Sequence, residues 1–223
     1  MRRRVFKKST PFRLVSTAVV GVSMGSLLAV VLLLLEEPKK VAEIPGPEAK
    51  HVAGDFRVLY QPGLMAGSQP SSNFERSRKY FNLRSPGQLP FLERDLNAYF
   101  NQLRSGADGS GEGVAFGAPN IRITEEGIVL SVLATVNPET SQKFDVTAQI
   151  FGNFEMSNSG PELVVDSLHL NSLRVPLGSV IADRLIRGFM GLAIPAESVE
   201  AWAQIEAIEL NDGRMSVKMG ART

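Results

Sequence analysis

The residue types that most often carry catalysis are scarce in this chain of 223 residues. It has no cysteine and two histidines, His51 and His169, so disulfides, thiolate metal sites and cysteine nucleophiles are absent. A Ser-His-acid triad needs a positioned histidine, and neither histidine has a G-x-S-x-G sequence nearby. We interpret His51 as a solvated side chain and His169 as a surface or hydrogen-bonded residue of a strand. We therefore expect no enzyme and no catalytic residues.

The acidic residues do not form a recognisable metal or cofactor motif. Asp108 and Glu112 lie in a glycine-rich loop but lack the twelve-residue pattern of calcium ligands. Two distant histidines without cysteine do not suggest zinc, and the sequence has neither a Walker A motif nor a G-x-G-x-x-G after a strand. Asp166 lies an even number of positions from strand residues that are expected to point inward, so its side chain is expected to point inward too. A charge in such a position more often protects a sheet edge than takes part in catalysis. We expect no metal and no cofactor.

The longest uncharged stretch is residues 14–35, which holds 22 residues and ends in a run of leucines. At about 1.5 Å per residue, a helix of this length spans the roughly 30 Å hydrocarbon core of a bilayer. A cleaved signal peptide is the alternative, but its apolar region is shorter and a small-x-small cleavage site follows it. Here Glu36, Glu37 and Pro38 follow directly. The sequence predicts an uncleaved transmembrane anchor.

The charges that flank this stretch predict its orientation. Residues 1–13 hold six of the 24 Lys and Arg residues and no acid, and the positive-inside rule places such a segment in the cytoplasm. Residues 14–223 then hold 18 basic and 23 acidic residues, a net charge of −5. We expect a single pass through the inner or plasma membrane, with an acidic domain of the cell envelope (periplasmic) outside the cytoplasm. Nucleic acid is not an expected partner.

Small residues form a stripe along the expected anchor. Gly21 and Gly25 make a G-x-x-x-G motif, and Ala29 extends it. Such stripes let two membrane helices approach closely, although glycine and alanine are also common in membrane spans by chance. Pairing of two copies through Gly21, Gly25 and Ala29, giving a homodimer, is one hypothesis.

The rest of the chain divides into a stalk, residues 36–50, and an extracytoplasmic domain, residues 51–223. The stalk is rich in Pro, Glu and Lys, which favours an extended spacer. Within the domain, 61–87 is expected to be irregular, and residues 89–104 and 178–192 have the apolar spacing of helices. Residues 202–210 and 215–219 flank Asn-Asp-Gly, a strong hairpin signal. Strands are expected at 121–124, 127–136, 143–156 and 163–173.

These elements predict an α+β fold: a curved antiparallel meander with one apolar and one wet face, about two helices on the apolar face, and a C-terminal hairpin. Strict alternation of apolar and polar residues over 143–156 places every second side chain on the apolar face. Seven residues on two strands are the candidate lining of an apolar groove. They are Phe144, Val146, Ile150, Phe154, Val164, Leu168 and Leu170.

Three segments resemble those of a known family. They are LPFLERDLNAYFNQL, IRITEEGIVLSV and LNSLRVPLGSVIADRL, the first holding Leu96 and Asn97 and the last Val175, Pro176 and Leu177. Together they resemble the YpmS-like family of single-pass bacterial envelope proteins, and more loosely the AsmA-like and tubular lipid-binding domains. The resemblance covers about residues 88–219 and implies no catalytic residues. The loop at 105–113 and the segment 61–87 depart from the family pattern.

Two functions are consistent with these features. The first is a membrane-anchored extracytoplasmic domain that binds an apolar ligand such as a lipid chain, because a one-sided apolar sheet with two helices leaves room for a groove. The second is a cell-envelope scaffold or assembly protein whose domain binds another protein through an apolar patch. An open groove lined by aliphatic side chains favours the first, and a filled core favours the second.

Overall fold

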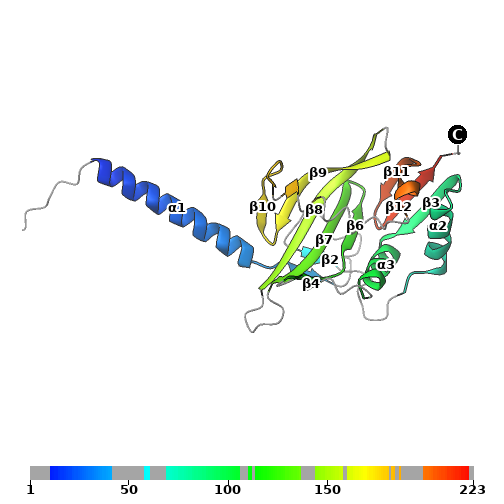
Figure 1. Cartoon of the computed structure of the whole chain (residues 1–223), viewed down its shortest axis with the longest axis horizontal. Coiled ribbons are helices and arrows are strands. Elements are labelled where there is room, and N and C mark those ends of the chain that lie inside the picture. The colour runs from blue at the N-terminus through cyan, green and yellow to red at the C-terminus, as the bar shows by residue number, and fades with distance from the viewer. Residues whose placement is uncertain are drawn as a thin grey trace, which may run out of the picture.

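The computed structural model describes residues 11–41, 58–60, 69–105, 110–111, 114–136, 144–157, 160–180, 182–183, 186 and 198–220. A long helix, α1 (Pro11–Leu35), extends from one end of a mixed α+β domain. A large antiparallel sheet forms the middle of the domain. A smaller sheet and two helices lie at the end far from α1 (Figure 1). The α+β fold class expected from the sequence is confirmed.

The large sheet is an antiparallel meander. It runs in the order β10-β9-β8-β7-β5-β4, and β6 pairs with the first half of β7. The four expected strands are present as β6, β7, β8 and β9 and pair in this order, but the strand expected at 163–173 ends at Leu170, where a turn leads into the separate strand β10. Strands β4, β5 and β10 were not predicted. The bounds of the strands in this sheet are β4 (Ser110–Gly111), β5 (Val114–Phe116), β6 (Asn120–Thr124), β7 (Gly127–Val136), β8 (Phe144–Ser157), β9 (Gly160–Leu170) and β10 (Leu173–Val175).

The small sheet holds the predicted C-terminal hairpin and one strand that was not predicted. Strands β11 (Ile205–Asn211) and β12 (Arg214–Met219) pair across the turn at Asp212 and Gly213, where Gly213 has φ 69°. A glycine takes this conformation at little cost. The third strand is β3 (Gly87–Leu92), paired antiparallel with β12.

The predicted start of the first helix was wrong. Residues 87–92 form β3, and helix α3 (Glu93–Ser105) begins only after it. Leu89 and Phe91 are buried while their neighbours are exposed, which is the alternation of a strand. Pro90 is tolerated because β3 lies at the edge of its sheet.

Helix α2 (Ser72–Asn82) lies inside the segment expected to be irregular. The Ser71 hydroxyl accepts a hydrogen bond from the Phe74 amide and so caps the helix. The same hydroxyl donates to the Asp95 carboxylate at 2.7 Å, which ties the start of α2 to α3. Phe74 and Phe81 are buried on one face of the helix. The sequence signals for this helix were its serine cap and two phenylalanines seven residues apart. Two apolar residues in eleven are too few to distinguish an amphipathic helix from a loop.

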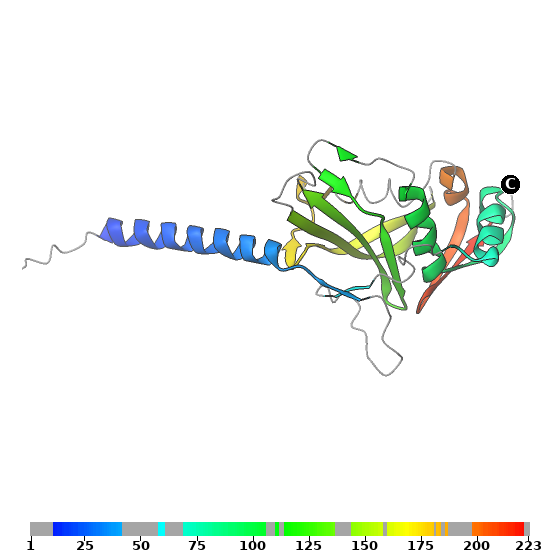
Figure 2. The same ribbon diagram turned by 90° about the horizontal axis from the view of Figure 1, so that it is seen from below.

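One core joins the two sheets. Buried residues from α2, α3, the meander and the small sheet belong to a single apolar cluster. Helix α3 and the small sheet contact the meander at its end far from α1, and α2 packs on β3 of the small sheet (Figures 1 and 2). The polar face of the meander was expected to be wet, but Ser131, Thr147 and Gln149 at its centre are at most 2% exposed. Both faces of the centre of the meander are therefore covered.

A β-bulge changes which residues of β9 face the core. Phe151 of β8 pairs with Ser167, but the next residue pairs with Val165, so Asp166 has no cross-strand partner. The extra residue reverses the alternation beyond this point. The prediction that Val164 and Asp166 point inward was therefore wrong: Asp166 is exposed and Val164 is 39% exposed. Leu163 and Val165 pack against the core instead.

The bulge brings two backbones close together at Gly152. A Cβ atom added there would lie 2.2 Å from the Val164 carbonyl oxygen. We expect Gly152→Ala to lower the free energy of unfolding by about 1–3 kcal/mol, as overpacked sites do. Gly117→Ala is the matched control, because its Cβ would lie 3.4 Å from the nearest backbone oxygen. Chemical denaturation of both variants checks this, and equal stabilities would contradict the packing at the bulge.

The C-terminal end of α1 is hydrogen-bonded to the meander. Asn171, fully buried with φ 51°, donates from its side-chain amide to the Leu34 carbonyl, and the Ser172 amide donates to the Leu33 carbonyl. The Asn171 Oδ1 atom also accepts from the Thr147 amide at 2.7 Å. One turn thus satisfies terminal carbonyls of the helix and fixes its end to β8.

Two predicted segments lie partly outside the described residues. Residues 39–41 of the expected stalk form β1 (Lys39–Val41), which pairs in parallel with β2 (Val58–Tyr60), and 42–50 are not described. Of the helix expected at 178–192, Ala182 is fully buried and Ile186 packs against the core. Among the described residues, no helix has both the length and the apolar character needed to cross a membrane. The membrane span therefore stays a prediction.

Candidate functional site

The candidate groove residues do not form one lining. Ile150 and Leu168 are 1% and 0% exposed and belong to the closed core. Phe144 and Val146, near the start of β8, are half-buried. Leu170 packs against the core, and Val164 lies on the opposite face. Of the seven, Phe154 lines a pocket.

This pocket lies between the meander and the elements that cover its apolar face. Its volume is about 120 Å³. Three groups of side chains form its wall: Phe74, Phe81, Leu96, Tyr99 and Phe100 from α2 and α3; Ile121, Ile128, Leu130, Phe154 and Leu163 from the meander; Phe91, Met215 and Val217 from the small sheet. An apolar cavity of similar size, about 150 Å³, stays dry and takes up benzene. The pocket suits one ring or a segment of an acyl chain.

Aromatic side chains hold the pocket wall in shape. Phe74 packs edge-on against Phe91, with ring centroids 5.9 Å apart, and Phe81 packs edge-on against the same ring at 6.1 Å. On the opposite wall Phe154 lies edge-on to Trp202 at 5.6 Å, and the Trp202 indole N–H donates to the Pro161 carbonyl. Edge-to-face pairs contribute about 0.5–1.5 kcal/mol each beyond the burial of their surface, so they stabilise this arrangement of the wall.

Polar groups border this apolar wall at α2 and at the segment that leads into α5 (Val199–Trp202). Arg78 and Ser198 line the pocket there. The Arg78 guanidinium lies 5.2 Å from the centre of the Tyr99 ring and donates to Glu75. The Ser198 hydroxyl donates to the Asn82 side-chain oxygen at 3.1 Å. A ligand in the pocket thus meets carbon on most sides and a guanidinium at one border.

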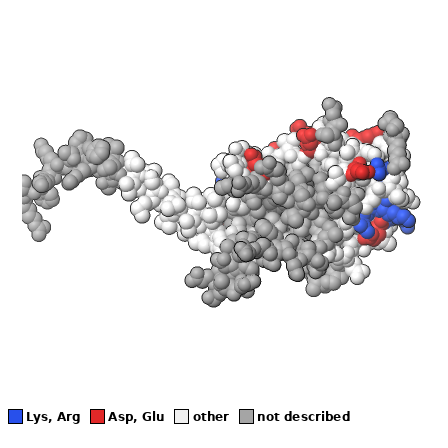
Figure 3. All heavy atoms as spheres, in the orientation of Figure 1, with Lys and Arg blue, Asp and Glu red and all other residues white. Residues whose placement is uncertain are grey.

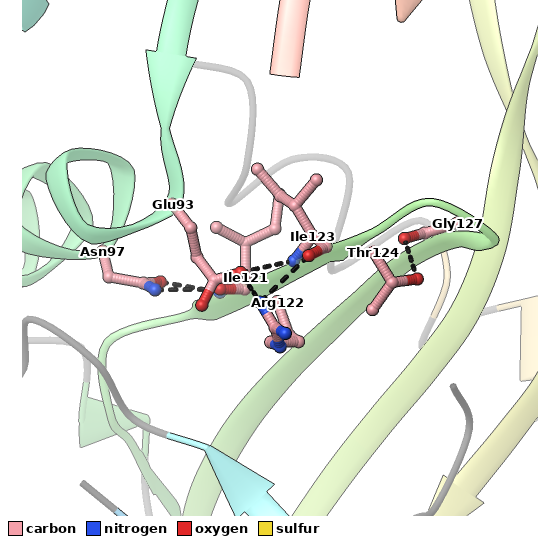
Figure 4. Close-up of polar contacts among 7 residues, drawn as sticks. All are labelled: Glu93, Asn97, Ile121, Arg122, Ile123, Thr124 and Gly127. Carbon is pink, nitrogen blue, oxygen red and sulfur yellow. Dashed lines mark hydrogen bonds and ion pairs between the residues drawn. The ribbon is translucent and has the colours of Figure 1, made fainter. Parts of the chain in front are cut away.

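A second cluster of polar side chains joins α3 to β6 (Figure 4). The Asn97 amide donates to the Ile121 carbonyl at 2.8 Å and accepts from the Ile121 amide at 2.7 Å. One turn earlier on α3, Glu93 Oε2 accepts from the Ile123 amide at 2.6 Å. Two helix side chains therefore take the place of a neighbouring strand along the free edge of β6, which would otherwise be open to pairing.

The same cluster contains a buried ion pair. Arg122 Nη1 lies 2.7 Å from Glu93 Oε2, and the two side chains are 9% and 2% exposed. Burial raises the pKa of the Glu93 carboxyl, and the hydrogen bond from Ile123 and the charge of Arg122 offset part of that rise. Glu93 Oε2 is occupied by Arg122 and by the edge of β6, whereas the buried Oε1 atom has no hydrogen-bond partner among the described residues. We therefore interpret this cluster as a structural joint between helix and sheet.

The remaining residues singled out in the sequence do not assemble into a site. His169 lies on β9, where burial lowers its pKa and the charge of Arg174 lowers it further. His51, Asp108 and Glu112 fall outside the described residues. Within the described ranges, no three His, Asp or Glu side chains lie close enough to hold a metal ion. Gly21 and Gly25 have open space around them on α1, and the proposed helix pairing stays untested.

Sequence reasoning missed the pocket because its wall comes from segments far apart in the chain. Its first lining residue is Phe74 and its last is Val217. Two of the contributing elements, α2 and β3, were not assigned or were assigned to another structure. The apolar spacing of Leu96 and Tyr99 along α3 was a usable signal for the face that now lines the pocket.

Comparison with models of known protein families and with curated proteins finds no match. The resemblance to the YpmS-like family therefore stays a prediction.

Proposed function

We propose that this protein is a membrane-anchored, extracytoplasmic domain that binds an apolar chain, such as part of a lipid, in the pocket between the meander and the α2–α3 end of the domain. The observation that carries the proposal is the cavity of about 120 Å³ with an almost wholly apolar and aromatic wall. A filled core would leave no such space, because protein interiors pack closely and hold few voids.

The size of the pocket limits the ligand. Pockets for drug-sized molecules usually measure about 300–1,000 Å³, so this cavity takes a chain segment or one ring rather than a complete lipid. The remainder of a longer ligand would extend past the border formed by Arg78 and Ser198. The site is thus suited to holding one end of a chain.

Support for the anchor comes from α1 and its flanks. Its described side chains project away from the domain, and Val22 and Met24 are 69% and 68% exposed. Burial of such a surface in a bilayer would remove a large apolar area from water. Six basic residues precede the uncharged stretch, which favours a cytoplasmic N-terminus.

Helices α2 and α3 and the small sheet, whose side chains form much of the pocket wall, lie at the end of the domain far from α1 (Figures 1 and 2). With α1 in the membrane, a bound chain would therefore be held away from the bilayer surface. This placement favours a role in presenting or handing on an apolar molecule in the cell envelope.

The test is ligand-dependent stability of the full chain, held in a detergent-free amphipathic polymer and titrated with 1-octanol. At ten times the dissociation constant, a ligand of the folded state adds about 1.4 kcal/mol to the free energy of unfolding. Leu163→Phe places a larger side chain in the pocket and should abolish the gain.

Val164→Phe is the matched control for that variant. It also introduces a phenylalanine, one residue further along β9, but the Val164 side chain lies on the opposite, exposed face of the sheet. We expect this variant to keep the stabilisation by octanol. Stabilisation that is absent from the natural chain, or that survives in Leu163→Phe, would contradict binding in the pocket and favour the alternative of a protein-binding scaffold.

A further inference from the structure

Arg78 borders two hollows at once. Its side chain is one wall of the apolar pocket and also lines a shallow hollow on the outer surface of α2, together with Glu75, Arg76, Lys79 and Asn82. The side chain is 35% exposed, so it reaches from the apolar wall into water. A chain that leaves the pocket at this border passes the guanidinium.

The outer hollow is basic. Three cationic side chains and one carboxylate line it, although residues 14–223 carry a net charge of −5. Figure 3 shows blue side chains gathered at the end of the molecule where α2 lies, with acidic ones beside them. A local excess of positive charge next to an apolar cavity is complementary to a molecule with an apolar chain and an anionic head.

The position of Glu75 shows that a carboxylate fits at this border. Both Arg78 Nε and Arg78 Nη2 donate to Glu75 Oε2, at 3.2 and 3.0 Å. Because Glu75 is half exposed and only three residues away on the same helix, this surface pair contributes little stability. A carboxylate brought by a ligand can therefore share the guanidinium with Glu75 or replace it at low cost.

We propose that the ligand of the apolar pocket is a carboxylate amphiphile of the fatty-acid type, whose chain lies in the pocket and whose head binds Arg78. This inference rests on the proposed function and adds the chemical class of the head group. The planar guanidinium and the planar carboxylate match in geometry, and a charge-assisted hydrogen bond is stronger than a neutral one.

The experiment compares octanoate with 1-octanol, which has the same chain length and no charge, on the full chain in a detergent-free amphipathic polymer. In Arg78→Gln we expect the affinity for octanoate to fall about three- to tenfold, and the affinity for octanol, which carries no charge, to fall by much less. Octanol binding that persists in the variant also shows that it is folded. In Glu75→Gln the affinity for octanoate should rise, because the competing carboxylate is gone.

Lys79→Gln is the matched control, because Lys79 lines the outer hollow but not the apolar pocket. It removes the same charge, and we expect a smaller loss of octanoate affinity than in Arg78→Gln. Equal losses in the two variants, or an octanoate affinity that Arg78→Gln leaves intact, would overturn the assignment of the head group while octanol binding still supported the pocket. If neither compound binds the natural chain, the proposed function itself fails.

Discussion

Replacing Glu93 by alanine should lower the free energy of unfolding by about 3–5 kcal/mol, the cost of breaking a buried ion pair on one side. The change leaves Arg122 buried without its carboxylate and removes the acceptor of the Ile123 amide. Both losses fall on the edge of β6 where α3 is attached. Chemical denaturation monitored by circular dichroism measures the effect.

Two further variants separate the effect of the buried ion pair on stability from the effect of the attachment of α3 to β6. Burial raises the pKa of Glu93, which means that the protein gains less from the ion pair than it loses by desolvating the carboxylate. Glu93→Gln combined with Arg122→Met removes both charges and keeps an acceptor for Ile123, so it should be more stable than Glu93→Ala. Glu206→Ala breaks an exposed pair with Lys218 and should cost less than about 1 kcal/mol. A cost for Glu93→Ala as small as this control would contradict the structural joint.

Replacing Ile150 by alanine should lower the free energy of unfolding by about 2–5 kcal/mol, because the side chain is 1% exposed in the closed core and leaves a cavity behind. The variant should still bind octanol, since Ile150 is not part of the pocket wall. Thermal unfolding with and without octanol measures both quantities in one experiment.

Val164→Ala is the control, because it tests on which face of the sheet this part of β9 places its side chains. Val164 was expected on the same face as Ile150 but is 39% exposed beyond the bulge, so its truncation should cost less than about 1 kcal/mol. A loss of unfolding free energy in Val164→Ala as large as that in Ile150→Ala would contradict the bulge. It would mean that the alternation expected from the sequence continues through β9.

The meander and the hairpin could be predicted because local signals and tertiary packing agree there. The strict alternation over β8 and the Asn-Asp-Gly turn each specify one structure. The bulge at Asp166 could not be predicted in this way, because an inserted residue changes the pairing partner without changing the composition of the strand. On the far side of the bulge, the alternation of residue types therefore predicts the wrong face of the sheet for each side chain.

Strand β3 shows why the start of α3 was misplaced. Leu92 and Leu96 extend the apolar spacing of the helix backwards, and proline is common in a first helical turn, so local rules favoured a longer helix. Pairing with β12 decided otherwise: Leu89 lies opposite Val217 and Phe91 opposite Met215. These contacts join residues more than 120 positions apart, and the pocket depends on the same long-range pairing.

The central claim is that an apolar chain enters the pocket, and the most direct measurement uses Trp202. It is the only tryptophan in the chain and lines the pocket, so all tryptophan fluorescence comes from one residue of the pocket wall. Titration of the full chain with 8-bromo-1-octanol should quench Trp202 saturably, because bromine quenches at contact. Octanol without bromine should reverse the quenching, and Leu163→Phe should prevent it. Quenching that rises without saturation, and equally in Leu163→Phe, would contradict a chain-binding pocket.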